Sequence, residues 1–167
     1  MSLSRQSILL GLGLSLTAGP LAAQTARRDP ATIARVLLGA MDAGDSGRVD
    51  ALLDSSFVLH YQGVPDPISK KDFLGLLGVN LAAFPDMRHE VHEVWPSGNT
   101  VTLNVMTRGT HKGTYEGVPA SGKQIAVGAL HVIRVKNGKI VEWWAAEDDL
   151  GTYRQIGMVI KPPPATP

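Results

Sequence analysis

The N-terminal half of the chain carries apolar residues at the three- to four-residue spacing of helices. One apolar face is formed by Ile33, Val36, Leu37, Ala40 and Met41, and a later one by Phe73, Leu74, Leu77 and Leu81. Asp29-Pro30 suits the start of the first helix, which ends at Ala43-Gly44-Asp45. A short helix around residues 49–53 follows. Ser69 predicts the cap of a third helix, which ends at Pro85.

The C-terminal half alternates between apolar and polar residues, as strands do. Strands are expected at residues 57–61, 89–95, 100–115, 124–136 and 139–148. Asn137-Gly138 predicts a type I′ turn between the last two strands, and residues 113–123 predict a longer loop. A short helix at residues 150–156 follows, and we expect a disordered tail over residues 159–167.

The order of these elements predicts a single α+β domain over residues 29–158. Helices come first and an antiparallel meander follows, so the helices are expected to pack on one face of a curved antiparallel sheet. Several strands are long enough for the sheet to bend into a cone. A cone-shaped sheet under helices leaves a cavity, and a small ligand would bind there.

The first residues look like a secretory signal peptide over residues 1–23. Arg5 precedes an apolar run from Ile8 to Leu16, and the segment ends in small residues at Ala23. The run is too short to span a bilayer, so we expect no stable membrane insertion after cleavage. We expect a protein exported to the periplasm or medium and cleaved near Ala23, by the general secretory route in preference to the twin-arginine route.

Composition narrows the choice of partners. Without residues 1–23 the chain has 15 basic and 15 acidic side chains. A chain without net charge has no electrostatic footprint for nucleic acid. There is no cysteine, so disulfides and thiolate chemistry are excluded. His89 and His92 lie three apart in a strand and face opposite sides, so we expect no metal site; with no phosphate or dinucleotide motif, we expect no cofactor.

His131 is the first candidate for chemistry, because it interrupts the apolar strand segment Ala129 to Ile133. It is either a hydrogen-bonded core histidine or a general acid or base of a pocket. Centring the hairpin on Asn137-Gly138 pairs His131 with a residue around 144–146. The acids Glu147, Asp148 and Asp149 then lie just beyond it. One of them, Asp148 or Asp149, is also expected to cap the following helix.

Aromatic and charged residues on the strands complete the candidate site. His131 and Asp148 are the expected catalytic pair. The expected substrate-binding residues are His60, Tyr61, Trp95, Arg108, Trp143 and Glu147. Trp143 and Trp144 face opposite sides of their strand, so one of them lines the cavity. Arg108 either binds an anionic or carbonyl group or pairs with Glu90 or Glu93 across the ladder.

Six segments occur in an order that resembles one known family. They are Phe84-Pro85-Asp86-Met87-Arg88, Gly109-Thr110-His111-Lys112-Gly113, Gly117-Val118-Pro119-Ala120-Ser121-Gly122-Lys123, Asn137-Gly138-Lys139-Ile140-Val141-Glu142-Trp143-Trp144, Asp148, and Arg154-Gln155-Ile156-Gly157. Together they resemble the SnoaL-like polyketide cyclase (ester cyclase) family over residues 30–157. The family belongs to the nuclear transport factor 2-like superfamily, so the resemblance also implies a cone-shaped α+β fold.

The resemblance implies an intramolecular aldol-type ring closure on a small hydrophobic carbonyl ligand, without metal or cofactor. In the family a strand histidine and an aspartate near the end of the following strand serve the pocket. His131 matches the histidine, and Asp148 matches a second family aspartate. The position that commonly carries the catalytic aspartate is Ala145 here. Relatives often dimerise through the outer face of the sheet, and a homodimer is therefore included among the expectations.

Two other functions fit the same pattern. One is a periplasmic protein that binds a small hydrophobic molecule without turnover. The other is an isomerase, dehydratase or hydrolase built on the same cone. Export favours both over polyketide assembly, which takes place in the cytoplasm, and fold alone does not choose between them.

Overall fold

The computed structural model describes residues 29–159, and the expected signal peptide and residues 160–167 lie outside them. The helices are α2 (Pro30–Asp42), α3 (Ser46–Leu52), α4 (Lys70–Ala83) and α5 (Asp149–Ile156). The strands are β1 (Leu53–Tyr61), β2 (Ile68–Ser69), β3 (Arg88–Ser97), β4 (Thr100–Thr110), β5 (Gln124–Lys136) and β6 (Lys139–Glu147). Within the described residues, no helix has the length and apolar character needed to cross a membrane.

Side-chain caps fix where the helices begin. Asp29 accepts a hydrogen bond from the Thr32 backbone N–H at 2.8 Å, and Pro30 opens α2. Ser69 caps α4 through the backbone N–H of Asp72. The Ser69 cap and the helix start at Asp29-Pro30 agree with the sequence prediction, and the side-chain oxygen of each capping residue satisfies a backbone donor of the first helical turn.

The strands form one six-stranded sheet in the order β2-β1-β6-β5-β4-β3. Strands β3 to β6 make the predicted antiparallel meander. The Asn137-Gly138 turn has positive φ at both residues, as a type I′ turn requires. The sheet is nevertheless mixed, because β1 pairs in parallel with β6. Hairpins fix the antiparallel pairs, whereas a long stretch of chain separates β1 from β6 and no turn sets their relative direction.

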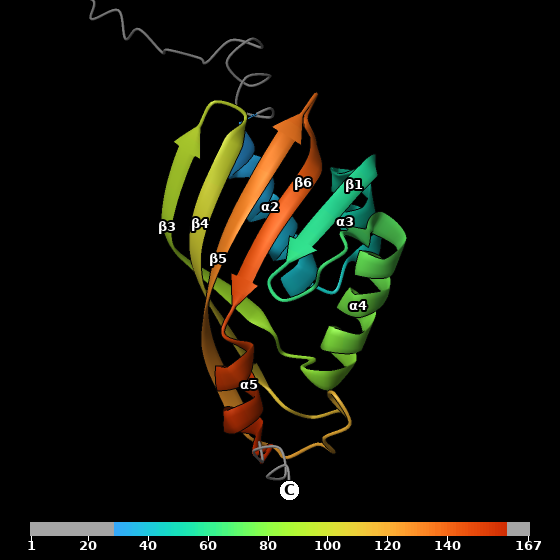
Figure 1. The fold of residues 1–167 in the computed structure, drawn as a ribbon, viewed down its shortest axis with the longest axis vertical. Helices are drawn as coiled ribbons and strands as arrows, with labels where there is room; N and C mark the ends of the chain where they lie inside the picture. Colours follow the sequence, from blue (N-terminus) through green and yellow to red (C-terminus); the bar gives the residue numbers. More distant parts are fainter. Residues whose placement is uncertain (1–28, 160–167) are drawn as a thin grey trace, which may run out of the picture.

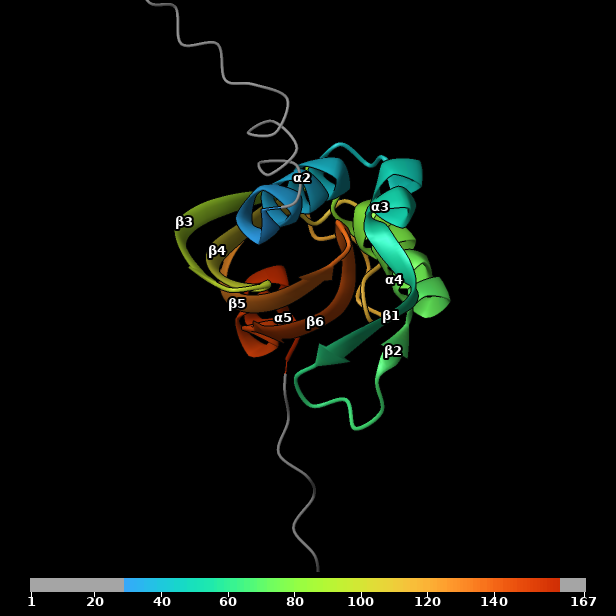
Figure 2. The same ribbon diagram turned by 90° about the horizontal axis from the view of Figure 1, so that it is seen from above.

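The sheet curves around its helices. Figure 1 shows α2 behind the long strands and α4 beside β1. Figure 2 shows the sheet bent into an open cone, with α2, α3 and α4 across its open side. Helix α2 packs on β3, β4 and β5, while α4 packs on β1. The expected α+β cone is therefore confirmed.

The core lies on the concave face of the sheet. In β5 every second residue from Ile125 to Val135 is buried, and the residues between them are largely exposed. The buried residues of β4 and β6 alternate in the same way and meet the apolar faces of α2 and α4. Side chains on the convex face consequently do not reach the space under the helices.

The segment after β4 turns away from the sheet earlier than the sequence predicts. Strand β4 ends at Thr110, and the backbone N–H groups of Lys112 and Gly113 bind the carbonyl oxygen of Ala83 at the end of α4. A Cβ atom at Gly113 would lie 2.3 Å from the carbonyl oxygen of Ala82, so this approach requires glycine. This contact holds the following loop, with Tyr115 and Glu116, against the end of α4.

Candidate active site

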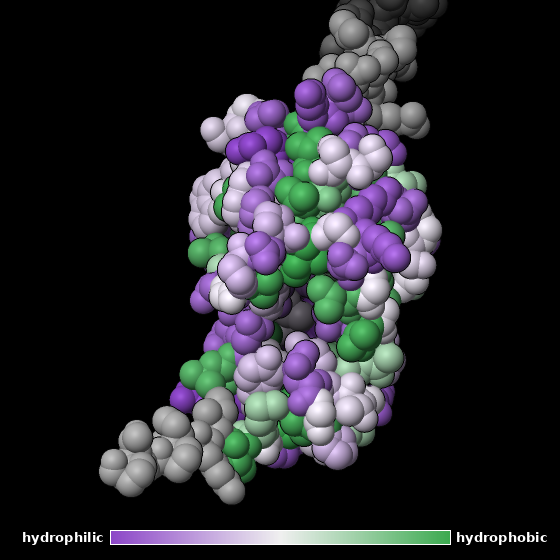
Figure 3. Space-filling view, turned by 45° about the vertical axis from the view of Figure 1, so that its right-hand side comes forward, coloured by the Kyte–Doolittle hydropathy of each residue, from purple (hydrophilic) through white to green (hydrophobic). Residues whose placement is uncertain are grey.

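A cavity of about 290 Å³ lies between α4, the inner face of the sheet and α5. Its apolar walls include Leu59, Phe73, Leu77, Phe84, Val127 and Trp143. It reaches the surface, because its lining residues Val64, Leu76 and Val79 are 44%, 46% and 52% exposed. Figure 3 shows a hollow on the side of the molecule that carries α4, with hydrophobic residues beside it. The volume lies near the lower end of the range for small-molecule sites.

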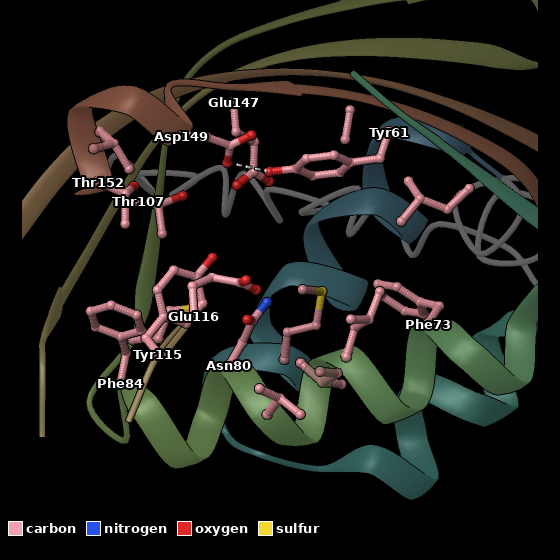
Figure 4. A pocket seen from close by; sticks show the side chains of 18 of the residues that line it. Tyr61, Phe73, Asn80, Phe84, Thr107, Tyr115, Glu116, Glu147, Asp149 and Thr152 are labelled. Carbon is pink, nitrogen blue, oxygen red and sulfur yellow. Dashed lines mark hydrogen bonds between the residues drawn. The ribbon is translucent and has the colours of Figure 1, made fainter. Parts of the chain in front are cut away.

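Polar groups line two opposite sides of this cavity. Figure 4 shows Glu147, Asp149 and Thr107 on the side of the sheet, and Asn80 from α4 across from them. The Tyr61 hydroxyl donates a hydrogen bond to Asp149 Oδ1 at 2.7 Å. Burial raises the pKa of Tyr61, and the charges of Glu147 and Asp149 raise it further. Tyr61 therefore remains a neutral hydrogen-bond donor.

Glu147 is the carboxyl group that strand β6 directs into the cavity. Trp143, Ala145 and Glu147 alternate along β6, and all three line the cavity. Burial raises the pKa of Glu147 above its ordinary value; His89 opposes this rise and Asp149 adds to it. A carboxylate whose pKa is raised is a stronger base than an ordinary glutamate, so Glu147 is suited to accept a proton from a ligand.

His89 on β3 also lines the cavity, and it forms a close pair with Asp42 at the end of α2. His89 Nδ1 lies 2.5 Å from Asp42 Oδ1, and the His89 backbone N–H donates to Asp42 Oδ2 at 3.1 Å. The carboxylate fixes the ring and holds a proton on Nδ1. Nε2 forms no hydrogen bond within residues 29–159, so it is left for a ligand.

From its position in the sequence, His89 is expected only as one of two histidines that cannot bind a metal together. The two rings do lie apart, because His92 is half-exposed beside Glu90. One signal was available: His89 alternates with Met87, just before β3, and with Val91 on β3, so a polar side chain occupies a position where its neighbours on the same face are apolar. Its partner Asp42 comes from a different element, and no local spacing predicts that contact.

His131 lies deeper than the cavity, within the packed core. It is 1% exposed and is absent from the cavity lining. Its Nδ1 accepts a hydrogen bond from the indole N–H of Trp143 at 3.0 Å. Burial lowers the pKa of His131 to about 3, so the ring is neutral at physiological pH. His131 therefore lies where a hydrogen-bonded core histidine would, the first of the two alternatives considered for it, and its ring orients Trp143.

Asp148 points away from the cavity. Its Oδ1 accepts the backbone N–H of Gly151 at 2.8 Å, which caps α5, and the residue is exposed. The prediction that Asp148 or Asp149 caps this helix is confirmed for Asp148. The expectation that Asp148 serves the pocket needs correction, because the next residue, Asp149, is the one that lines it.

The expected substrate-binding residues divide between the two faces of the sheet. Tyr61, Trp143 and Glu147 line the cavity. His60 and Arg108 do not, because strand alternation turns them to the convex face, and neither does Trp95, because the β-bulge between Val91 and Glu93 interrupts the alternation that runs from His89.

Local contacts account for the residues on the convex face. His60 stacks on Trp144 and lies 3.0 Å from Glu142. Arg108 donates to Glu90 Oε1 at 2.9 Å, one of the two partners expected for it. Trp95 is 50% exposed, next to a β-bulge in the pairing of β3 with β4.

Curated relatives match part of the chain. The aklanonic acid methyl ester cyclase DnrD of Streptomyces peucetius is 37% identical over 76 residues, which are 45% of this chain and 52% of DnrD. The aklanonic acid methyl ester cyclase DauD of Streptomyces sp. (strain C5) is 38% identical over 61 residues, which are 36% of this chain and 38% of DauD. The matches thus span about half of the first relative and less of the second.

Solved structures and a family profile match nearly the whole domain. IdmH from Streptomyces antibioticus superposes with a TM-score of 0.71 at 29% identity, over 77% of this chain and 98% of IdmH. AclR from Streptomyces galilaeus superposes with a TM-score of 0.72 at 21% identity, over 78% of this chain and 97% of AclR, which supports the fold. The profile described as "SnoaL-like polyketide cyclase" matches residues 31–156. The chain therefore belongs to the SnoaL-like polyketide cyclase family.

Proposed function

We propose that this protein catalyses cofactor-independent, aldol-type acid–base chemistry on a small apolar carbonyl compound, with Glu147 as the group that moves the proton. The observation that carries the proposal is the carboxyl group of Glu147, which lies in an apolar cavity with a raised pKa and faces His89. A carboxylate in apolar surroundings is a stronger base than one in water, because desolvation disfavours its charge.

The proposed reaction is a ring closure within one molecule. The Glu147 carboxylate removes a proton from a carbon next to a carbonyl group, and the resulting enolate carbon attacks a second carbonyl carbon of the same molecule. A carbon–carbon bond forms, the second carbonyl oxygen becomes an alkoxide, and Glu147 returns the proton to that oxygen. The product is an isomer of the substrate, so no oxidant, reductant or co-reactant is needed.

His89 would stabilise the negative charge that develops on the enolate oxygen. Asp42 occupies Nδ1, which leaves Nε2 as the nitrogen that can donate into the cavity. A donor held in place before the reaction stabilises the developing charge without reorganisation.

Glu147 would take over the role of the aspartate that the family commonly has at position 145. Ala145 and Glu147 are two apart on β6 and point into the same cavity. The shift along the strand is about 6.6 Å, and glutamate is one methylene longer than aspartate. Ala145 itself pairs with His131 and lines the cavity.

The names of two relatives support a cyclisation reaction. DnrD and DauD are both described as cyclases of aklanonic acid methyl ester, a carbonyl compound. Because the matched segments cover only part of each relative, their substrate is not carried over to this chain.

Hydrogen exchange at an activated carbon tests the first step without the natural substrate. We expect the protein to accelerate deuterium uptake by 2-tetralone in D2O, followed by NMR. Glu147→Gln should remove the acceleration, since an amide cannot accept the proton. Glu142→Gln is the matched control, because Glu142 lies on the convex face with Arg134 and His60 and should leave the exchange rate unchanged.

The same assay addresses the alternatives. Tight binding of 2-tetralone without exchange would contradict the proposal and favour a binding protein. Exchange that persists in Glu147→Gln would contradict the assignment of Glu147. An isomerase or dehydratase on this fold shares the proton abstraction, so only its product would differ.

A further inference from the structure

We propose that the cavity selects a ligand that carries an organic ammonium group on an apolar or aromatic body, in preference to an uncharged or anionic ligand of the same shape. The inference names the charge of the substrate for the same cavity. It depends on the proposed function for turnover but not for binding.

The charged groups around the cavity are unbalanced. Glu116, Glu147 and Asp149 line it, whereas neither lysine nor arginine occurs among the lining residues in the described range. None of the three acids forms an ion pair with another residue of the 29–159 domain. His89 is the one histidine in the lining, and its Nδ1 is paired with Asp42.

An unpaired carboxylate in an apolar cavity is costly. Asp149 accepts a hydrogen bond from Tyr61, but a hydroxyl group brings no positive charge. A ligand with an ammonium group would supply the missing counter-charge. A ligand carboxylate would instead add a further negative charge to a region that already has three acids.

Thr107 points independently to a polar ligand atom. It is 6% exposed and lines the cavity, and its Oγ1 has no hydrogen-bond partner within the part of the chain that the structure describes. Figure 4 shows Thr107 on the same side of the cavity as Glu147 and Asp149. An ammonium N–H directed at this side would satisfy the hydroxyl oxygen as well as the carboxylates.

Aromatic rings line the rest of the cavity and suit the same ligand. Tyr61, Phe84, Tyr115, Trp143 and Tyr153 all contribute to the lining. The negative face of such rings attracts a cation, and their bodies bury an apolar skeleton. Carboxylates and aromatic rings together are the surroundings in which a protonated amine is better stabilised than a neutral hydroxyl compound.

Three probes that differ in one group test the inference by calorimetric titration at pH 7. They are 2-naphthylmethylamine, 2-naphthylmethanol and 2-naphthoate, which present a cation, a neutral group and an anion on the same ring. We expect the amine to bind at least about tenfold more tightly than the alcohol, the difference typical of one charge-assisted hydrogen bond, and the carboxylate to bind most weakly.

Variants of the lining residues show which side chains cause the preference for the amine. The double variant Glu147→Gln/Asp149→Asn keeps the size of both side chains and should bring the amine to the affinity of the alcohol. Thr107→Val should weaken amine binding by a few fold. Glu142→Gln removes a carboxylate of the convex face and should leave all three affinities unchanged.

Equal or tighter binding of the alcohol in the wild-type protein would overturn the inference, as would tightest binding by the carboxylate or failure of the amine to bind. An amine preference that survives the double variant would also overturn it, because the cation would then sit elsewhere. These probes do not react, so the outcome is separate from the exchange assay: an amine preference without exchange refutes the proposed reaction and leaves the inference intact.

Discussion

The concave face of the sheet has a packed half and a hollow half, and each contains one histidine. In the packed half His131 is enclosed by core residues and bonded to the Trp143 indole. In the hollow half His89 lines the cavity and is paired with Asp42. Both side chains alternate inward on their strands, so the difference arises from what lies above them. Core side chains fill the space over His131, whereas His89 borders open volume.

Because of this difference, His131 orients a neighbouring side chain, whereas His89 can take part in the chemistry. A neutral histidine with a pKa lowered to about 3 cannot move protons at neutral pH, but it can hold an indole ring in place. A histidine fixed by a carboxylate at one nitrogen and open at the other can stabilise charge on a ligand. The position of each histidine along the cone therefore decides its role.

The largest expected effect is on the exchange rate, which should fall when His89 is replaced but not when His131 is replaced. His89→Gln should lower the rate of 2-tetralone exchange about 100-fold, as loss of one donor to a developing oxyanion does. Asp42→Asn should cost about tenfold, because the ring loses its orienting partner. His131→Gln keeps an acceptor for Trp143 and should change the rate by less than about threefold, within the range of packing adjustments. A loss in His131→Gln equal to that in His89→Gln would break the comparison.

The next effect concerns stability. His131→Leu leaves the indole N–H of Trp143 without an acceptor in the core, so the free energy of unfolding should fall by about 1–3 kcal/mol. Urea denaturation at pH 7 measures this difference. His131→Gln should retain most of the stability, and an equal loss in both variants would show that the hydrogen bond contributes little.

His131 should also make stability depend on pH. The unfolded chain takes up a proton on this histidine below its ordinary pKa of 6.5, whereas the folded protein does so only near 3. The unfolded state therefore binds more protons in this window, and stability rises as the pH rises from about 3 to 6.5. Urea midpoints for the wild type and His131→Gln, compared across this range, should show a shallower rise in the variant. Parallel curves would contradict a buried neutral histidine.

The smallest expected effect is on the free energy of unfolding, and it concerns Glu147 in the hollow half of the concave face. The pKa of Glu147 is raised in the folded state, so its stabilising contribution is present below its ordinary pKa and is lost as the pH rises through the raised value. Glu147→Gln should therefore be more stable than the wild type at pH 7, by roughly 0.5–1 kcal/mol, while losing exchange activity. A decrease in thermal midpoint at pH 7 would indicate that the charged carboxylate is well compensated.

Local patterns predicted the turns and the alternation along each strand, but not which residues reach the cavity: His60, Trp95 and Arg108 were expected to bind substrate and lie on the convex face. The register of β5 and β6 followed from the Asn137-Gly138 turn, and His131 does pair with Ala145 as expected. Alternation placed one of Trp143 and Trp144 toward the cavity, and the structure shows that it is Trp143. His131 was a candidate for the pocket because it interrupts an apolar strand segment, and such a segment contains no information on how closely the layer above it is packed.

The missed residues share one physical cause. His89 gains its role from Asp42, which lies on α2, and Asp149 gains its role from Tyr61 on β1. Both contacts join elements that are distant in sequence, so they follow from packing and not from spacing. Asp148 was expected at the pocket because it matches a family aspartate, whereas the path of the chain makes Asp148 the cap of α5 and places Asp149 in the cavity lining.

The pH dependence of exchange tests the central claim most directly. In the wild type the rate of 2-tetralone exchange should rise with pH and level off above a single pKa that lies above the ordinary pKa of glutamate, 4.5. The rise should be absent in Glu147→Gln and unchanged in Glu142→Gln. A rise of the same size and midpoint in Glu147→Gln would contradict the account, because another group would then be the base.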